Sequence, residues 1–430
     1  MINLKNSVLL SENNMFYLIL AYIFTINLDM KVLTDVLTTL MFILAGINIY
    51  NKKRIPPPFF LREKLPIWVI VSVLCIVVPL LLSCFVSSNM GESFKFCRRL
   101  IKDILPAFLI FYFIDDKKKI KILLITLLSS LFIEFIYSLV VYSEHFADVL
   151  FYNKSFPRMQ GYPPEEGKWP TFMLLSMKLE LSFCLSYILI LDKKMAFGKN
   201  LLKIMMASTL IALFFNNTRM AWIIVIIMFI VLTGFYLKSI KKILIAVFSS
   251  FVLISCLVYT QPWLQHRIQD TIYMRDGSSQ LHHRYVKDGI VMIKDRPILG
   301  WGMGQFGKIY NESYRSDITN ELIEKFHEHV PVPYAHNMFV DMAIDSGLLG
   351  LIGYIICYGN FLFFSLRDWF RYKSISGLMF FAIISCFVLH GFSEKVLSFG
   401  QIVEYQYCLL GMYLVYRKYE IDEYNKNIRG

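Results

Sequence analysis

Residues 66–88 read PIWVIVSVLCIVVPLLLSCFVSS and contain no charged side chain. A stretch of about 20 apolar residues can cross the roughly 30 Å hydrocarbon core of a bilayer as a helix. Eleven other stretches are comparable, some of them only with tilt or short flanks: residues 14–30, 33–50, 100–114, 120–142, 171–191, 200–216, 219–237, 242–260, 336–365, 374–391 and 400–416. The sequence therefore predicts an all-α polytopic membrane protein with about 12 transmembrane helices.

The composition agrees with this architecture. The 430-residue chain is 56% hydrophobic and 18% charged. Ordinary soluble domains are about 45–50% apolar and about 25% charged. The mean hydropathy of +0.53 points the same way, and these values exclude a disordered chain, a coiled coil and a soluble cytosolic enzyme. The eight cysteines lie mostly in apolar stretches without a C-x-x-C motif, which gives no support to a zinc ribbon or a disulfide scaffold.

The charge pattern predicts the orientation of the helices. There are 44 Lys and Arg residues against 32 Asp and Glu residues, and basic clusters occur in every second loop. Basic loops face the cytoplasm in membrane proteins, so this excess favours a membrane topology over nucleic-acid binding. Both termini are expected in the cytoplasm. Residues 1–260 would hold helices one to nine, 261–335 a periplasmic loop subdomain, 336–416 the last three helices, and 417–430 a cytoplasmic tail.

The longest polar stretch is the predicted outer loop at 261–335. It contains nine basic and nine acidic residues, with helical patterning at 285–294 and 318–329. Long loops in compact proteins are usually functional or disordered. The patterning favours the first alternative, a folded helical subdomain.

Three groups of polar residues fall at the outer membrane boundary of this topology. Arg219 begins a predicted helix, where an arginine can also be a snorkelling interface anchor. The run His282-His283-Arg284 precedes a glycine-rich segment that could admit a ligand close to the backbone or form a simple turn. Its glycines at alternate positions are Gly300, Gly302 and Gly304. His336 and Asn337 begin a long apolar stretch, where a histidine can be a cap or interface residue as well as a catalyst.

Other charges invite a functional and a structural interpretation alike. Lys178 lies inside a predicted span, where an ionisable group suggests function but can also belong to a local ion pair. The adjacent Arg98 and Arg99 lie on the outer side, where they could hold a lipid diphosphate or phospholipid headgroups. His327 and His329 are two residues apart and H-E-x-x-H is absent, so no metal site is predicted.

Taken together, these motifs resemble the O-antigen ligase and O-antigen polymerase superfamily. Its signature is His, then Asn, Ser or Gln, nine residues, Gly, two residues and a small residue or Tyr. This chain matches it with His336-Asn337, Gly347 and Gly350. The Arg-x-x-x-Leu motif appears at 219–223 with Ile in the last place. Arg284 precedes a Pro-x-x-Gly-x-Gly turn, as the family's second arginine does. The resemblance covers residues from about 80 to 416.

The resemblance implies an enzyme of lipopolysaccharide biosynthesis in the bacterial inner membrane, similar in fold to C-type membrane glycosyltransferases. Such an enzyme moves O-polysaccharide from undecaprenyl diphosphate to a sugar hydroxyl of lipid A–core on the periplasmic face, with inversion and without metal or cofactor. The His motif favours the ligase, and the polymerase remains the alternative. A polysaccharide or lipid transporter is a more distant one, because the polar features gather on one face rather than at the midplane. The expected partners are these two substrates and membrane lipids, without nucleic acid.

The residue chemistry suits this reaction. His336 would be the general base, since a neutral imidazole can take the proton of the attacking hydroxyl near working pH. Arg219 and Arg284 would bind the departing diphosphate, because guanidinium groups hold phosphate oxygens bidentately and stay charged. The residues expected to bind substrate are Arg98, Arg99, Lys178, Asn337, Gly302 and Gly304.

Overall fold

The computed structural model describes residues 12–28, 31–51, 65–114, 116–146, 159, 171–192, 198–237, 240–260, 262–326, 332 and 334–429. These residues form helices and connecting turns, and no strand occurs among them. The helices of the first half are α1 (Glu12–Asn27), α2 (Lys31–Asn51), α3 (Ile67–Val86), α4 (Met90–Phe113), α5 (Lys117–Tyr142), the 3-10 turn η4 (Ser143–His145), α7 (Thr171–Leu191), α8 (Lys199–Asn216), α9 (Arg219–Leu237) and α10 (Ile240–Thr260).

A group of shorter, more polar helices follows, and the chain then returns to long apolar ones. The polar group, which we call the loop subdomain, consists of α11 (Pro262–Ile272), α12 (Gly277–Asp295), α13 (Phe306–Ile309), the π-helical turn η5 (Tyr310–Tyr314) and α14 (Asp317–Phe326). The last helices are α15 (Met338–Tyr372), α16 (Ile375–His390), the 3-10 turn η6 (Val396–Ser398) and α17 (Gly400–Arg429).

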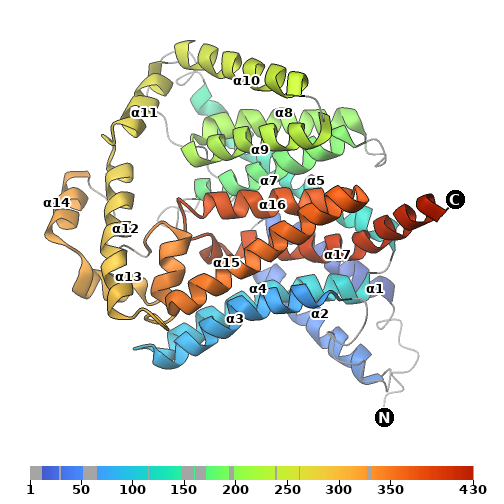
Figure 1. Ribbon diagram of the computed structural model, residues 1–430, viewed down its shortest axis with the longest axis horizontal. Coiled ribbons are helices and arrows are strands. Elements are labelled where there is room, and N and C mark those ends of the chain that lie inside the picture. The colour runs from blue at the N-terminus through green and yellow to red at the C-terminus, as the bar shows by residue number, and fades with distance from the viewer. Residues whose placement is uncertain are drawn as a thin grey trace.

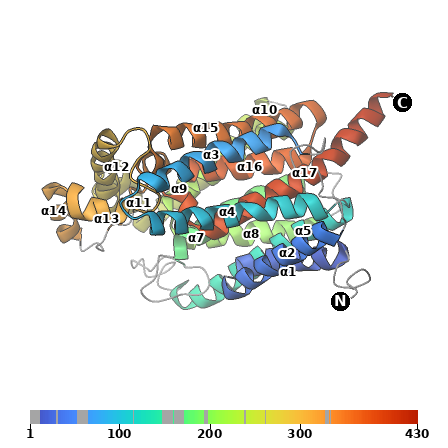
Figure 2. The same ribbon diagram turned by 90° about the horizontal axis from the view of Figure 1, so that it is seen from below.

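The loop subdomain lies at one end of a bundle of long helices (Figure 1). α12 crosses this end of the bundle, whereas α17 ends at the opposite side (Figures 1 and 2). Within the bundle, α15 packs along α3 and α17 packs along α4. Gly353 of α15 permits one of these approaches, because a Cβ there would collide with the backbone carbonyl of Cys75 in α3. Small residues at helix interfaces are typical of membrane bundles.

The protein is a multi-pass helical membrane protein, as expected from the sequence. Five segments of the described residues are long and apolar enough to cross a bilayer: Ile67–Val86, Lys117–His145, Phe172–Leu191, Arg219–Leu237 and Met338–Tyr372. The predicted total of 12 spans, their orientation and the domain boundaries stay predictions. The predicted separation of residues 200–216 and 219–237 into two helices is confirmed. α8 ends at Asn216, and Asn217 adopts a left-handed backbone conformation that ends the helix.

Two predicted helices differ from their observed bounds. The expected span 100–114 is the second part of α4, which begins ten residues earlier at Met90 because Asn89 caps it by accepting a hydrogen bond from the Glu92 amide. The expected span 336–365 starts at Met338, extends to Tyr372 and is interrupted at Ser346 and Gly347.

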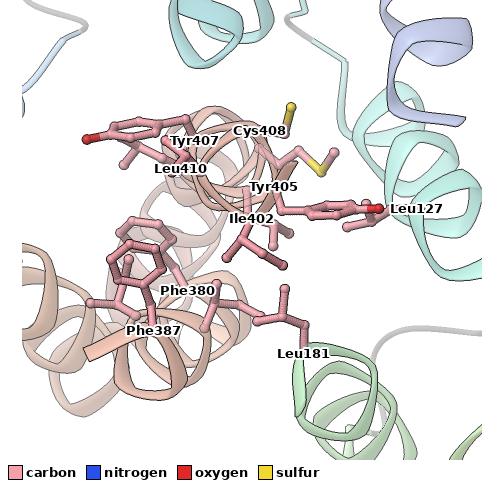
Figure 3. Close-up of a cluster of buried hydrophobic side chains, with 14 of the residues drawn as sticks. Leu127, Leu181, Phe380, Phe387, Ile402, Tyr405, Tyr407, Cys408 and Leu410 are labelled. Atoms are coloured by element: carbon pink, nitrogen blue, oxygen red, sulfur yellow. The ribbon is translucent and has the colours of Figure 1, made fainter. Parts of the chain in front are cut away.

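The centre of the bundle is filled by apolar and aromatic side chains from four helices. Phe380 and Phe387 of α16 pack with Ile402 and Tyr405 of α17, and Leu181 and Leu127 close the cluster from α7 and α5 (Figure 3). Inside a membrane such contacts stabilise the bundle by close packing rather than by removal from water. The loop subdomain meets the helices beyond this packed centre, at one end of the bundle (Figure 1).

Candidate functional site

The interruption of α15 forms the base of the site. Gly347 has φ +69° and ψ −171°, outside the helical region, and a Cβ there would collide with the carbonyl of Ile298. The break releases backbone groups that bond to the turn after α12. Leu348 N donates to Pro297 O at 2.7 Å, and Trp301 N donates to Ile344 O at 2.8 Å. The helix break at the signature glycine Gly347 therefore allows α15 to form backbone hydrogen bonds with the glycine-rich turn.

Gly302 and Gly304 belong to this turn, with φ values of +100° and +77°. A Cβ at Gly302 would collide with Ser87, and one at Gly304 with the ring of Phe96. Gly302 N also donates to Asp345 O at 2.9 Å. The close approach expected at these glycines is therefore to the protein's own α3–α4 corner, and their proposed role in substrate binding remains a prediction.

Asn337 holds the start of α15. Its side-chain oxygen accepts hydrogen bonds from the amides of Phe339 and Val340, both at 3.1 Å, and its Nδ2 donates to Phe392 O at 3.2 Å. Such an N-cap satisfies amides that the helix itself leaves unpaired. The capping role alone explains why an asparagine stands at position 337, and contact with substrate is not needed to explain it.

His336 precedes this cap in a left-handed backbone conformation, φ +53°, and its side chain is 15% exposed. Its Nδ1 lies 3.2 Å from Oε2 of Glu394, which the turn between α16 and η6 carries. For an ionised carboxylate and a neutral imidazole, this contact requires that Nδ1–H donates to Oε2, which leaves Nε2 as the acceptor. The pair has the arrangement of a base held by a carboxylate, and Glu394 is itself only 2% exposed.

Three rings of the loop subdomain and its last connection surround His336. The His282 ring stacks on it with centroids 4.1 Å apart and an interplanar angle of 14°. The Tyr334 and Tyr285 rings lie at 4.5 Å and 5.8 Å. α12 therefore packs directly against the imidazole of His336.

His282, His336 and Glu394 also form a set that could ligate a metal, since their ligand atoms lie within 4.8 Å of one another. Two histidines and a carboxylate are a common zinc set. A metal lies close to the plane of each imidazole that binds it, however, and two nearly parallel stacked rings cannot share such a point unless one of them turns. The arrangement therefore fits a hydrogen-bonded base better than a metal centre, and the expectation of no metal remains a prediction.

Arg219 fastens the start of α12 to the start of α9. Its NH1 and NH2 donate to the two carboxylate oxygens of Asp276 at 2.9 Å and 3.2 Å, and NH1 also donates to Ser279 Oγ at 3.2 Å. Burial alone would raise the pKa of Asp276, but the hydrogen bonds from Arg219 and Ser279 outweigh it and lower the pKa to about 2. Ser279 and His282 are one turn apart, about 4.5 Å along the axis, so Arg219 and His336 contact neighbouring turns of α12.

Arg284 points elsewhere in this structure. Its Nε lies 3.2 Å from Asp288 Oδ1 and donates to Ser316 Oγ at 3.1 Å, beside α14. Two residues along a helix correspond to about 200° of rotation, so Arg284 and His282 lie on nearly opposite sides of α12. The structure brings Arg219 and His336 to one side of α12 and turns Arg284 to the other, and a single site containing all three remains a prediction.

A cavity of about 960 Å³ borders this region. Residues from α1, α2, α4, α7, α13, η5, η6, the start of α17 and the connections between helices line it: Ile26, Thr34, Asp35, Phe96, Arg99, Lys102, Asp103, Leu174, Gly304, Gly307, Lys308, Asn311, Glu312, Val332, Tyr334, Lys395, Ser398, Phe399, Gly400, Gln401 and Glu404. Arg99 thus faces the cavity, whereas the exposed Arg98 is not among its lining residues. The two arginines therefore differ in their surroundings, and their proposed binding of a lipid diphosphate remains a prediction.

Lys178 lies inside the bundle, away from the cavity lining. It is completely buried, and its Nζ donates to both carboxylate oxygens of Glu134 at 2.9 Å. Glu180 pairs separately with His390 at 2.7 Å. This geometry matches the local ion pair weighed from the sequence and does nothing to support substrate binding by Lys178.

Sequence reasoning assigned no role to His282, Glu394 or Lys395. Lys395 is buried, with its Nζ 2.5 Å from Asp345 Oδ2, and it lines the cavity next to the His336–Glu394 pair. One signal was present, since the predicted topology puts Lys395 on the outer side, where the positive-inside pattern disfavours a lysine. Nothing in the spacing of the sequence indicated that residue 394 reaches residue 336.

The fold and the site together define a class: a multi-pass membrane protein with a histidine, a carboxylate and an arginine gathered at one helix of a polar subdomain. Residues 204–355 match the family model described as O-antigen ligase, which confirms the recognition of the O-antigen ligase superfamily from the motifs. The matched range includes Arg219, Arg284, His336 and the interruption of α15. It supports a membrane enzyme of O-antigen processing. No curated protein matches the chain.

Proposed function

We propose that the protein is an O-antigen ligase, which transfers O-polysaccharide from undecaprenyl diphosphate to a sugar hydroxyl of lipid A–core. The observation that carries the proposal is the His336–Glu394 pair, with Nδ1 and Oε2 3.2 Å apart, on the same side of α12 as Arg219. The family match supports the superfamily, and the ligase assignment goes beyond it.

In this mechanism Nε2 of His336 accepts the proton of the acceptor hydroxyl as its oxygen attacks the anomeric carbon. The bond from that carbon to the diphosphate oxygen breaks, and the configuration at the carbon inverts. Glu394 stabilises the imidazolium that forms, because its carboxylate accepts the Nδ1 hydrogen throughout. The proton leaves His336 for water after the products depart.

The departing diphosphate gains negative charge as the bond breaks, and fixed cations lower the free energy of that state. Arg219 is placed for this role at the start of α12, where the helix dipole also favours an anion. In the ligand-free structure its guanidinium is held by Asp276, so a diphosphate has to compete with that carboxylate. Arg284 would reach the same group only if its contacts with Asp288 and Ser316 were exchanged.

The proposed setting is the bacterial inner membrane, with His336 facing the periplasm and both termini in the cytoplasm. Both substrates carry lipid tails, so a site at the outer leaflet lets each reach it from the bilayer. The basic loops support this orientation.

The test is transfer from purified lipid-linked polysaccharide to lipid A–core in detergent, with a chelator present. His336→Ala should abolish transfer while the protein remains folded and monodisperse. Full activity of that variant, or loss of wild-type activity on adding chelator alone, would contradict the metal-free histidine-base mechanism.

A strain in which the gene is deleted distinguishes a ligase from a polymerase. Loss of a ligase leaves long lipid-linked polymer and unmodified core. Loss of a polymerase leaves core that bears a single repeat unit, and that result would replace the ligase assignment.

A further inference from the structure

The large cavity borders the proposed base through neighbours of His336 and Glu394, and Arg219 is not among its lining residues. Tyr334, whose ring lies 4.5 Å from that of His336, forms part of its wall, and so does Lys395, which follows Glu394 in the chain. No lining residue comes from α9 or α12, the helices that hold Arg219 and Arg284. With a volume of about 960 Å³, the cavity falls in the range of ligand pockets, roughly 300–1,000 Å³.

The charges of the lining do not suit a diphosphate. Four cations are balanced by four carboxylates: Arg99, Lys102, Lys308 and Lys395 against Asp35, Asp103, Glu312 and Glu404. Two of the cations are already paired, Lys102 with Asp35 and Lys395 with Asp345, each at 2.5 Å. An anion with several charges would meet as much repulsion as attraction here, whereas Arg219 offers it a fixed bidentate donor.

The same lining suits a hydroxyl-rich ligand. Asp103 of α4 and Glu404 of α17 are 3% and 6% exposed, and both belong to the cavity wall. Carboxylates accept hydrogen bonds from hydroxyl groups, and Phe96 and Phe399 add aromatic surface beside them. Arg99 and Lys308, which also line the cavity, could bind an anionic substituent on the same ligand.

We propose that this cavity binds the oligosaccharide end of the acceptor, while the diphosphate of the donor approaches His336 from the Arg219 side of α12. This assignment rests on the proposed function, because a transferase with two lipid-linked substrates needs two routes to one base. It places the attacking hydroxyl on the Tyr334 side of the imidazole, with Asp103 and Glu404 holding the sugar that carries it.

A labelling experiment tests occupancy directly. Ser398 is exposed and lines the cavity, whereas Cys256 is the exposed member of the eight cysteines. Ser398→Cys in a Cys256→Ser background is therefore labelled with a bulky maleimide after folding, with and without ligand. Core oligosaccharide freed of lipid A, at ten times its dissociation constant, should slow labelling about tenfold by occupying the site. Cys256 in the wild-type protein provides the control, and its labelling should not change.

The donor is the second ligand in the labelling experiment, and it is expected not to protect the cysteine. Undecaprenyl-diphosphate-linked polysaccharide should leave the labelling rate of the Ser398→Cys variant unchanged. Protection by the donor added alone, or no protection by the glycan, would overturn the assignment. If the glycan protects but no transfer from the donor is detected, the cavity assignment holds and the proposed function fails.

Kinetics of isosteric variants supply the second measurement. Asp103→Asn and Glu404→Gln should each raise KM for the acceptor about tenfold or more, the loss expected for one charged hydrogen bond, with KM for the donor unchanged. Glu92→Gln, an exposed carboxylate on α4 outside the cavity lining, is the matched control and should change neither constant. A rise in KM for the donor, or unchanged KM for the acceptor in both cavity variants, would contradict the proposal.

Discussion

Replacing Glu394 with glutamine probes the carboxylate that holds the proposed base. The amide keeps the shape of the side chain, and its carbonyl can still accept from Nδ1 of His336, but the negative charge is gone. The two atoms lie 3.2 Å apart in a nearly buried setting. Opposite unit charges at 3.2 Å attract by about 5 kcal/mol at an effective dielectric constant of about 20.

Desolvation offsets part of that attraction, and hydrogen bonds to charged groups contribute about 1.5–3 kcal/mol net. This charge is needed most in the transition state, when the imidazole becomes positive. A loss of about 2–3 kcal/mol there corresponds to a fall of roughly 30- to 150-fold in kcat/KM.

The assay is initial-rate transfer of lipid-linked polysaccharide to lipid A–core with purified Glu394→Gln protein, alongside its thermal unfolding midpoint. Glu420→Gln is the matched control. Glu420 also accepts hydrogen bonds, in a partly buried position, from Ser374 and Ser376 at the other end of α16. The control should lose stability but keep kcat/KM. An activity of Glu394→Gln within about twofold of wild type, or an equal loss in the control, would refute the reasoning.

Four further outcomes are expected. If Arg284 binds the diphosphate, Arg284→Lys should lower kcat/KM for the donor by at least about tenfold, because an ammonium group cannot form the two parallel hydrogen bonds of a guanidinium. An unchanged kcat/KM would mean that Arg284 serves only its contact with Asp288. Gly347→Ala should destabilise the protein by about 1–3 kcal/mol, seen as a lower unfolding midpoint, because φ +69° and the nearby Ile298 carbonyl leave no room for a methyl group. The ion pair between Arg219 and Asp276 should persist above about pH 4 and be lost as the pH falls towards 2, because the pKa of Asp276 is lowered to about 2. Amide hydrogen exchange at the start of α12 should therefore become faster between these pH values. The Asp276→Asn variant should not show this pH-dependent increase. A reporter active only in the periplasm should be on when fused after Asn311 and off after Arg371, and the reverse would reject the topology.

The membrane character, the break between α8 and α9 and the start of a long helix near His336 could all be predicted from the sequence. The interruption of α15 could not, because a helix that is apolar on all sides gives no periodic signal in which a break would show. The start of α4 was missed since charged residues precede its apolar part, and only the Asn89 cap marks its true beginning.

The candidate site was foreseen in part. Spacing indicated that His336 and Arg219 lie at helix ends, but their convergence on α12 depends on how the loop subdomain packs. The opposite facing of Arg284 and His282 follows from helical geometry once α12 is known to include both. Glu394 and Lys395 reach the site through tertiary packing across 58 and 50 residues of sequence, for which one sequence carries no signal.

The hydrogen bonds between the glycine-rich turn and the broken helix set a rule for recombining this protein with its relatives. Ile344 and Asp345 accept from the turn, and Leu348 donates to it, so each segment completes the backbone pairing of the other. Backbone groups left unpaired near the membrane cost several kcal/mol each. Every non-proline residue carries the same backbone groups, so a chimaera that exchanges residues 297–302 without 344–348 keeps this pairing only if the incoming turn retains glycine at positions 300 and 302, whose φ values are +67° and +100°. Crossovers between relatives therefore depend on these turn glycines and on Gly347, whose backbone conformation lets the two segments meet.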